Sequence, residues 1–380
     1  MHYIKLLRPP QIELIRGEQI LKLVIAITTD LGDSYLSPKD PIDLLVIGAY
    51  PSPKDASSLI PINLTSNPRT TPKWKSGDRV LKLDLPLPPR QQHPITTIQI
   101  RPLTKEITLL STTDIYPPTS SSSLSGLIMP AFSDISVGSL PFRSLRLPTP
   151  DTPTTLQIEE DMGDSIARHI WDSGIATTSL IADMLLTQNS NMAMPTFQKF
   201  LKSTSEPLQI LEIGCGIGTL GIALARILSL TSIPPPRILM TDLPEAETRA
   251  RANISRQPFP ISACLEFEPL DWEEGKLGKF GTRVQNQQKW DLIVVSDCTY
   301  NTDTLGSLVG TLGAVHKYSC GGGGEGPKVF LATKSRHSSE REFFDLMKGD
   351  GWKIEEEMKV ELPHIDGEGM PIEIYLFGRE

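Results

Sequence analysis

The sequence is poor in cysteine and aromatic residues, has no excess of positive charge and contains no long hydrophobic run. Its cysteines show no Cys-x-x-Cys spacing, which argues against a zinc site, and we interpret them as reduced thiols of an intracellular protein. No stretch approaches the ~20 apolar residues that a membrane-spanning helix requires. The formal net charge of −8 argues against a general electrostatic attraction to nucleic acid or anionic membranes. The cysteines are Cys215, Cys264, Cys298 and Cys320.

What is present is a chain of ordinary globular composition that is long enough for two domains. It has 380 residues, of which 39% are hydrophobic and 22% are charged. Its first residues, MHYIKLLRPPQIELIRGEQ, lack the apolar core and the small-residue cleavage site of a secretory signal. We therefore expect a monomer of the cytoplasm, the nucleus or both, without membrane binding or direct nucleic-acid binding.

Residues 1–150 predict a β-rich accessory domain. Many prolines separate its strand-like runs, and proline interrupts both strand ladders and helices, so we expect short strands in a sandwich or barrel-like arrangement. Two segments rich in Pro, Ser and Thr, Pro117–Gly126 and Leu147–Thr155, predict a linker that ends near residue 150. The strand-like runs are Gln19–Thr29, Ile42–Ala49, Arg79–Leu85 and Thr97–Ile100.

Residues 151–380 alternate between apolar strand-like runs and helix-prone segments, which predicts a parallel sheet with helical crossovers. The last two strands are joined by LPHIDGEGMP without a helix, so we expect a hairpin and an antiparallel last strand. The fold class is therefore α/β, with a seven-stranded, mostly parallel sheet. The strands are expected at 208–213, 237–242, 263–268, 290–296, 328–333, 352–360 and 371–378. The helices are expected at 173–186, 219–230, 244–256, 303–317 and 338–348.

The stretch Leu208–Gly221, LQILEIGCGIGTLG, predicts a strand, a glycine-rich turn and the start of a helix. Such a turn brings backbone N–H groups and the positive end of a helix close to a ligand. A dinucleotide fingerprint would need a glycine at position 219, where the chain has Thr219. The pattern is instead an acidic residue before three alternating glycines: Glu212, Gly214, Gly216 and Gly218. A carboxylate there suits the ammonium group of methionine and repels a pyrophosphate, so the pattern favours S-adenosyl-L-methionine. A dinucleotide site, or a turn that binds nothing, is the alternative.

Asp242 ends the next predicted strand, about 24 residues after the last motif glycine. A carboxylate at this strand end can accept hydrogen bonds from both hydroxyls of an adenosine ribose. The alternative is a helix cap, because Pro244 and Glu245 follow with the spacing of a capping box. The two roles can coexist.

Two tryptophan motifs flank this region. In PLDW, after the third strand, Asp271 is placed to bind the adenine amino group and Trp272 to cover the ring. In IWDSGI, before the glycine turn, Trp171 is placed to wall off the methionine end of the cofactor. The alternative for both tryptophans is ordinary core packing, with Asp271 solvated.

The segment SDCTY, from Ser296 to Tyr300, follows the strand WDLIVV at the expected ligand edge of the sheet. A carboxylate at Asp297 can hold an acceptor amine and take its proton, and Tyr300 can line its channel. The alternative is that Asp297 caps a helix and Tyr300 packs. Adenine and glutamine methyltransferases usually have two prolines here, where this chain has Cys298 and Thr299.

Taken together, the five motifs over about residues 160–380 resemble the family 16 group of seven-β-strand protein methyltransferases, which are mostly lysine methyltransferases. The resemblance implies that Trp171, the glycine turn, Asp242, Trp272 and Ser296 contact the cofactor. It also matches Asp297 and Tyr300 to the Asp/Glu-x-x-Tyr/Phe active-site motif of the family. The segments Glu273–Lys289 and Gly321–Gly324 depart from the family pattern as a polar loop and an insertion.

These observations predict an S-adenosyl-L-methionine-dependent methyltransferase that modifies a lysine of a protein substrate, without a metal. Two other functions remain open on the sequence. One is a small-molecule N-methyltransferase, and the other is a non-catalytic module that recruits a partner through the N-terminal domain.

Overall fold

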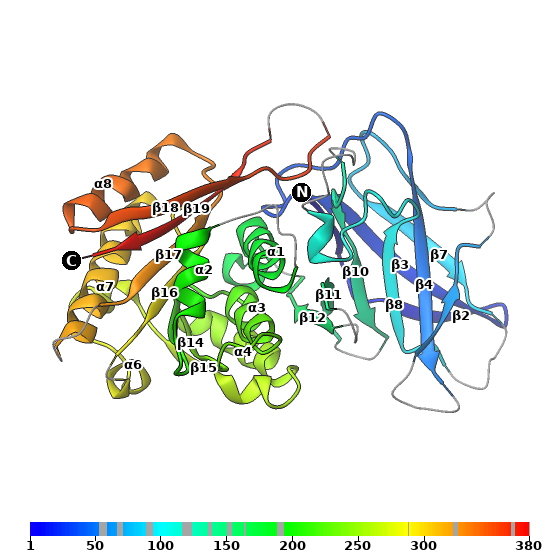
Figure 1. Cartoon of the computed structure of the whole chain (residues 1–380). Helices are drawn as coiled ribbons and strands as arrows, with labels where there is room; N and C mark the ends of the chain where they lie inside the picture. The colour runs from blue at the N-terminus through cyan, green and yellow to red at the C-terminus, as the bar shows by residue number, and fades with distance from the viewer. Residues whose placement is uncertain are drawn as a thin grey trace. The chain divides into compact units, whose positions relative to one another are not determined.

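The chain divides into two compact units in a computed structural model (Figure 1). Unit 1 comprises Met1–Arg146, Gln157–Ser165 and Pro363–Gly367, and unit 2 comprises Leu147–Leu156, Ile166–Leu362 and Glu368–Glu380. Two short segments beyond the expected boundary near residue 150 thus belong to unit 1. The structure describes residues 1–52, 59–66, 71–88, 94–115, 124–135, 139–149, 154–162, 165–187, 194–287, 289–321, 326–365 and 369–379.

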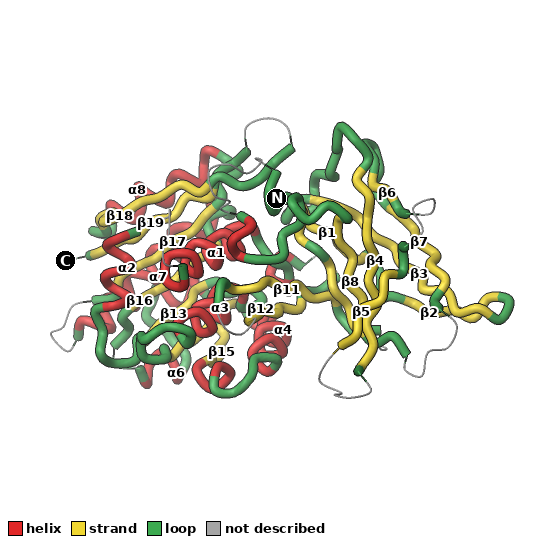
Figure 2. Tube along the Cα trace, turned by 45° about the vertical axis from the view of Figure 1, so that its right-hand side comes forward, coloured by secondary structure: helices red, strands yellow, loops and turns green. Residues whose placement is uncertain are grey.

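Unit 1 consists of strands, as expected from apolar runs between prolines (Figure 2). Most of them are short, but Glu18–Thr28 and Ile42–Pro51 form strands of 11 and 10 residues, longer than expected. One sheet has the order β2-β3-β1-β9 with β7 paired to β3, and the other has the order β12-β11-β10-β8-β4-β5 with β6 paired to β4. Side chains of both sheets share one apolar core that contains the fully buried Trp74. The strands are β1 His2–Leu6, β2 Gln11–Ile15, β3 Glu18–Thr28, β4 Ile42–Pro51, β5 Leu59–Asn63, β6 Lys73–Trp74, β7 Leu81–Pro86, β8 Thr97–Pro102, β9 Ile128–Met129, β10 Ala131–Asp134, β11 Pro141–Leu147 and β12 Thr154–Glu159, with a 3-10 turn η1 at Thr112–Asp114.

The predicted linker segments fall largely outside the described residues, which omit 116–123 and 150–153. At the described ends of the second segment, β11 ends at Leu147 and β12 begins at Thr154.

Unit 2 is a mixed sheet with helices on both faces. The sheet order is β15-β14-β13-β16-β17-β19-β18, in which β13 to β17 run parallel and β19 is antiparallel to both of its neighbours. Helices α1, α3 and α4 cover one face and α7 and α8 cover the other (Figure 1). The strands are β13 Gln209–Ile213, β14 Arg237–Asp242, β15 Leu265–Pro269, β16 Leu292–Ser296, β17 Lys328–Thr333, β18 Lys353–Val360 and β19 Ile372–Gly378. The helices are α1 Asp172–Leu186, α2 Pro195–Lys202, α3 Thr219–Leu228, α4 Pro244–Ser255, α5 Trp272–Gly275, α6 Thr282–Asn286, α7 Thr302–Cys320 and α8 Glu342–Gly349, with 3-10 turns η2 Ile166–Arg168, η3 Ile261–Cys264 and η4 Ser338–Arg341.

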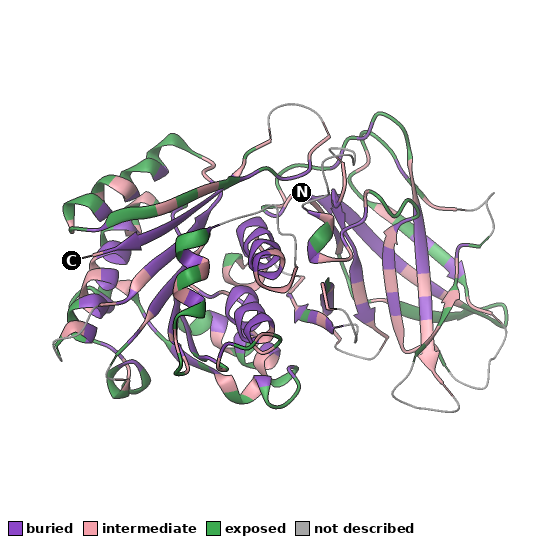
Figure 3. Cartoon of the chain, viewed as in Figure 1, coloured by how far each residue is buried: buried purple, intermediate pink, exposed green. Residues whose placement is uncertain are grey.

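The burial of the central elements explains why these apolar segments form strands and helices. The central strands are buried along nearly their whole length, as are α1 and α3 (Figure 3), which is typical of parallel strands covered by helices on both faces. In the part of the chain that the structure describes, no helix combines the length and the apolar character needed to span a bilayer.

Several local expectations were wrong. Helix α2 is not among the helices expected from the sequence, and the predicted polar loop Glu273–Lys289 contains α6 and most of α5. The predicted helix 338–348 begins as the 3-10 turn η4 before α8. Residues 322–324 of the predicted insertion lie outside the described residues.

Candidate functional site

The glycine turn between β13 and α3 contains three residues with left-handed backbone conformation. Gly214, Gly216 and Gly218 have φ angles of +71°, +54° and +85°, a region that side chains other than glycine rarely adopt. At Gly214 there is also no space, because a Cβ atom would overlap the Sγ atom of Cys298. The turn therefore packs its backbone directly against the segment that follows β16.

Glu212 lies under this turn with only 2% of its surface exposed. Its Oε2 atom accepts a hydrogen bond from the Gly221 N–H at 3.1 Å. Burial raises the pKa of Glu212 to about 8, the charge of Asp242 raises the pKa further, and the Gly221 hydrogen bond opposes the rise. The side chain is thus a neutral carboxylic acid near neutral pH unless a cation approaches it.

Asp242, the last residue of β14, fastens the turn. Its Oδ2 atom accepts the Gly216 N–H at 2.7 Å, and its Oδ1 atom accepts the Leu243 N–H at 2.7 Å. Burial is the largest effect and raises the pKa of Asp242 above its ordinary value, although these two hydrogen bonds oppose the rise. The capping-box alternative is wrong, because the N-cap of α4 is Leu243 and no side chain caps that helix.

The PLDW motif lies beside the same turn. The Leu270 N–H donates to the Asp242 carbonyl at 2.8 Å, which ties the motif to the end of β14. Asp271 is exposed and caps α5 by accepting the Glu273 N–H at 2.9 Å. The indole of Trp272 is partly buried, and its Cζ2 atom is 3.2 Å from the position that a Cβ atom on Gly214 would take.

Asp297 is buried and tightly held, directly after Ser296 at the end of β16. Its φ of +52° is left-handed, and its side chain is only 3% exposed. The Oδ2 atom accepts the Ser173 N–H at 3.1 Å, and the Oδ1 atom accepts the Lys334 N–H at 3.1 Å. The helix-cap alternative from the sequence is correct in kind, but the helix is α1, far away in the sequence.

Tyr300 is half exposed, in the loop before α7. Burial is the main cause that raises its pKa, and the negative charges of Asp242 and Glu245 add to the rise.

A charged cluster whose pairing the sequence does not predict surrounds Trp171. Asp172 and Lys334 form a buried ion pair with an Nζ to Oδ2 distance of 2.6 Å. The guanidinium of Arg336 lies over the Trp171 indole, 5.3 Å from the ring centroid, and its Nη1 atom is 3.5 Å from Oδ1 of Asp297. A basic residue following a strand gives no signal of such pairing, although Asp172 stands inside the IWDSGI motif that had been singled out.

All of these groups gather at one edge of the sheet. The motifs follow the carboxyl ends of β13, β14, β15 and β16, and parallel strands place these ends together. The Ser173–Asp297 hydrogen bond adds the start of α1, and so Trp171, to this edge. Ligands of open α/β sheets bind at this edge.

The residues at this edge fit S-adenosyl-L-methionine. The left-handed turn leads into the N-terminus of α3, and carboxyl groups stand at the ends of two neighbouring strands. Beside Asp297, the Ser173 hydroxyl is buried and has no hydrogen-bond partner within the described ranges, so a polar ligand end would satisfy it. Those ranges contain no cluster of three or more His, Cys, Asp or Glu side chains placed to hold a metal ion.

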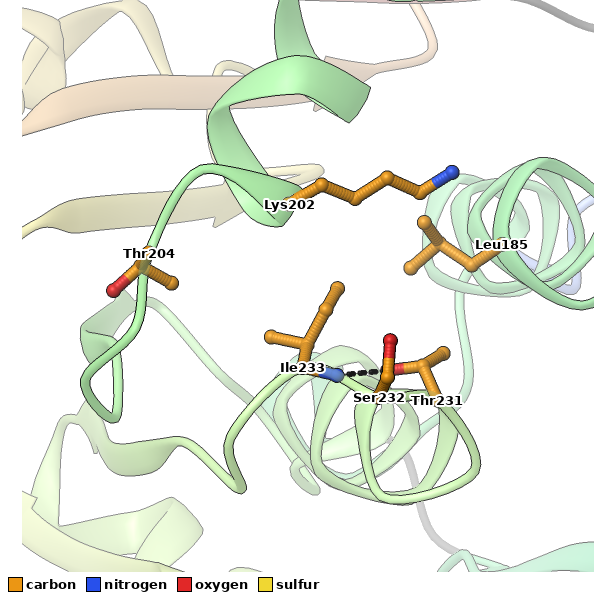
Figure 4. Close-up of a pocket in the computed structure, with 6 residues that line it drawn as sticks. All are labelled: Leu185, Lys202, Thr204, Thr231, Ser232 and Ile233. Carbon is orange, nitrogen blue, oxygen red and sulfur yellow. Dashed lines mark hydrogen bonds between the residues drawn. The ribbon is translucent and has the colours of Figure 1, made fainter.

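A separate pocket of about 370 Å³ lies at the other end of these elements (Figure 4). It is lined by Leu185 near the end of α1, Lys202 at the end of α2, Thr204, and the loop Thr231–Ile233 that precedes β14. Within it the Ile233 N–H donates to Thr231 Oγ1 at 3.1 Å (Figure 4). None of the motif residues lines this pocket.

Comparison with known proteins gives relatives for half of the chain. A UPF0665 family protein of Schizosaccharomyces pombe is 26% identical over 190 residues, which cover 50% of this chain and 49% of that protein. The matched part is thus about half the length of this curated relative.

Solved methyltransferase structures resemble the chain weakly. The glycopeptide N-methyltransferase MtfA in complex with (S)-adenosyl-L-methionine has a TM-score of 0.34 and 10% identity, and the match covers 47% of this chain and 90% of that one. An O-methyltransferase family protein from Burkholderia thailandensis has a TM-score of 0.32 and 13% identity, with coverages of 55% and 61%.

The family assignment comes from residues 151–350, which match the family model described as lysine methyltransferase. These residues span over half of the chain and contain all five motifs, so the match confirms the resemblance seen in the sequence. The chain belongs to this lysine methyltransferase family.

Proposed function

We propose that the chain methylates the side-chain amine of a lysine in a protein substrate. The observation that carries the proposal is the position of Asp297. Its carboxylate is fixed at the carboxyl edge of the sheet, and the glycine turn packs against the next residue, Cys298. The description of the matching family supports the same substrate class.

In this proposal the cofactor lies along the glycine turn. Asp242 would accept hydrogen bonds from the ribose, Asp271 would bind the adenine amino group, and Trp272 would cover the adenine. Trp171 and Ser296 would contact the methionine end, where Glu212 would lose its proton as the cofactor ammonium approaches. When bound, S-adenosyl-L-methionine supplies an electrophilic methyl group on a sulfonium sulfur.

Asp297 would act on the acceptor. A lysine amine is protonated near neutral pH and must lose that proton before its lone pair can attack a methyl group. The negative charge of Asp297 would draw in the ammonium group, orient it and help it to lose the proton. Tyr300, half exposed in the loop before α7, would form one wall of the entrance. No covalent enzyme intermediate is needed, so positioning accounts for most of the catalysis.

A labelling experiment tests this function. The full chain is incubated with a cell extract and with S-adenosyl-L-methionine labelled in its methyl group, beside the Asp297→Asn variant as the inactive control. We expect label on lysine residues of one or a few proteins, identified by mass spectrometry, and only with the parent chain. Label that appears only in small molecules, or on residues other than lysine, would overturn the proposal. Absence of both label and S-adenosylhomocysteine binding would point to the non-catalytic module.

A further inference from the structure

Arg336 connects two motifs of the site that the sequence places far apart. Its guanidinium lies 5.3 Å from the centroid of the Trp171 ring, at the start of α1. Its Nη1 atom is 3.5 Å from Oδ1 of Asp297, after β16, and 3.4 Å from the Lys334 carbonyl, after β17. One planar cation therefore touches the aromatic wall and the carboxylate at the same time.

The surroundings hold Arg336 in this place. Its own backbone N–H donates to Glu340 Oε1 at 3.1 Å, so the chain around it is anchored to η4. The neighbouring Lys334 is already committed to Asp172 in a buried ion pair. The Trp171 indole is fixed from its other end by a hydrogen bond from Nε1 to the Ile166 carbonyl at 3.2 Å. The indole is thus held between η2 and Arg336.

We propose that Arg336 is a positioning residue for methyl transfer, which acts by holding the Trp171 indole and the Asp297 carboxylate in one fixed arrangement. This inference rests on the proposed function, in which Trp171 bounds the methionine end of the cofactor and Asp297 receives the acceptor amine. A displacement of about 1 Å at reacting groups costs on the order of 100-fold in rate. Because Arg336 contacts both Trp171 and Asp297, we expect its removal to lower kcat more than it lowers cofactor affinity.

The chain offers a matched control on another part of unit 2. Arg379 lies over Trp352, 5.6 Å from the ring centroid, and its Nη1 atom is 2.6 Å from Oδ2 of Asp350. The second set thus contains the same three residue types as the set of Arg336, Trp171 and Asp297. This second set lies beyond the end of β19, next to the amino end of β17, and therefore away from the carboxyl edge.

The test compares Arg336→Ala and Arg336→Lys with Arg379→Ala in the full chain. Two measurements are made, and the first needs no acceptor. It is acrylamide quenching of Trp171, obtained as the difference between each protein and its Trp171→Phe partner. The second is methyl transfer, with kcat and KM separated. We expect Arg336→Ala to make Trp171 more accessible to acrylamide and to lower kcat by about 10- to 100-fold, with a smaller rise in KM for S-adenosyl-L-methionine because Trp171 contacts the cofactor in the proposed function. Arg336→Lys should recover part of kcat, and Arg379→Ala should change neither measurement.

Unchanged Trp171 quenching in Arg336→Ala would overturn the inference. So would a loss of kcat that is matched by an equal loss of cofactor affinity and by early thermal unfolding, because that would show a merely structural residue. If the parent chain methylates no lysine, the proposed function fails, and the quenching measurement still decides whether Arg336 positions Trp171.

Discussion

The Oδ2 atom of Asp297 accepts the backbone N–H of Ser173 at 3.1 Å, although 124 residues separate the two in the sequence. The N-cap residue of α1, Trp171, makes no side-chain hydrogen bond that caps the helix. Asp297 therefore does for α1 what a local capping residue does for most helices, since it satisfies one of the unpaired N–H groups at the helix start. The residue proposed to receive the acceptor amine is also the residue that fixes the Trp171 wall.

This double role determines how Asp297 should be tested. Asp297→Ala should lose the helix cap, at a cost of about 1 kcal/mol, and should strain the left-handed backbone by about 1–2 kcal/mol more, because alanine avoids positive φ. Asp297→Asn tolerates that conformation and keeps one acceptor oxygen for one of the two N–H groups, so it should be destabilised less than Asp297→Ala. It should still lose methyl transfer by about 100-fold or more, because it lacks the charge that draws in the ammonium group.

Denaturant unfolding, S-adenosylhomocysteine calorimetry and transfer assays on the two variants check this expectation. Methyl transfer at the parent rate by Asp297→Asn would show that the carboxylate is only a helix cap.

Glu212 should make the stability of unit 2 depend on pH in an unusual direction. Burial raises its pKa in the folded chain from the ordinary 4.5 to about 8. Between these two values the folded state holds a proton that the unfolded state has lost. The free energy of unfolding therefore falls as pH rises through this window, by at most about 1.4 kcal/mol per pH unit.

The difference in the free energy of unfolding between the parent and the Glu212→Gln variant isolates this contribution, because the two proteins share all other titrating groups. We expect the parent to lose stability relative to Glu212→Gln as pH rises from about 5 to 8, in denaturant titrations at each pH. Parallel curves for the two proteins would contradict the raised pKa.

The order of elements in unit 2 could be predicted because it depends on local patterns. Strands 237–242 and 328–333 were placed at their observed bounds, and the glycine spacing identified the turn, since period and turn chemistry are local properties. The carboxyl-edge position of the motifs then followed from the parallel order.

What the sequence could not show are contacts between distant residues. The Asp172–Lys334 pair spans 162 residues, and nothing near Lys334 marks it as buried. Helix α2 was missed for a similar reason: its first turn is capped by Glu356 of β18, which accepts the Thr196 and Phe197 N–H groups at 3.1 and 2.9 Å. Such partners become visible only after the sheet has formed.

Gly214 should tolerate no side chain, for two separable reasons. Its φ of +71° disfavours alanine by about 1–2 kcal/mol, and a Cβ atom would overlap Cys298 Sγ. Gly278 is a matched control, with a φ of +72° and nothing within 4 Å of a Cβ atom. We expect Gly278→Ala to show the backbone cost alone, and Gly214→Ala to lose about 1–3 kcal/mol more from overpacking and to bind S-adenosylhomocysteine weakly.

Removing the Cys298 sulfur tests the second reason, which is the overlap between that atom and a Cβ atom at position 214. The double variant Gly214→Ala with Cys298→Ala should recover most of the extra loss in denaturant unfolding, since the overlapping atom is gone. If the double variant is no more stable than Gly214→Ala, then the overlap does not explain the need for glycine.

Unit 1 contains a buried ion pair between Arg143 and Glu160. Arg143 and Glu160 are 2% and 4% exposed, and Arg143 Nε donates to Glu160 Oε1 at 2.7 Å. Arg143 Nη1 also donates to the carbonyls of Ile4 and Pro130, each at 2.8 Å. Breaking a buried pair from one side leaves a desolvated charge, which costs about 3–5 kcal/mol, whereas replacing both partners by apolar residues costs much less.

We therefore expect Glu160→Leu to destabilise unit 1 by about 3–5 kcal/mol and the double variant Arg143→Met with Glu160→Leu to be clearly more stable than that single variant. Trp74 reports on this unit alone, because it is the one tryptophan in residues 1–146, and it is fully buried with its Nε1–H bonded to the Leu36 carbonyl at 2.8 Å. Its fluorescence in a denaturant titration, taken as the difference from Trp74→Phe, gives the midpoint for each variant. Equal midpoints for the single and double variants would mean that the carbonyl contacts of Arg143, and not its pairing with Glu160, hold these strands together.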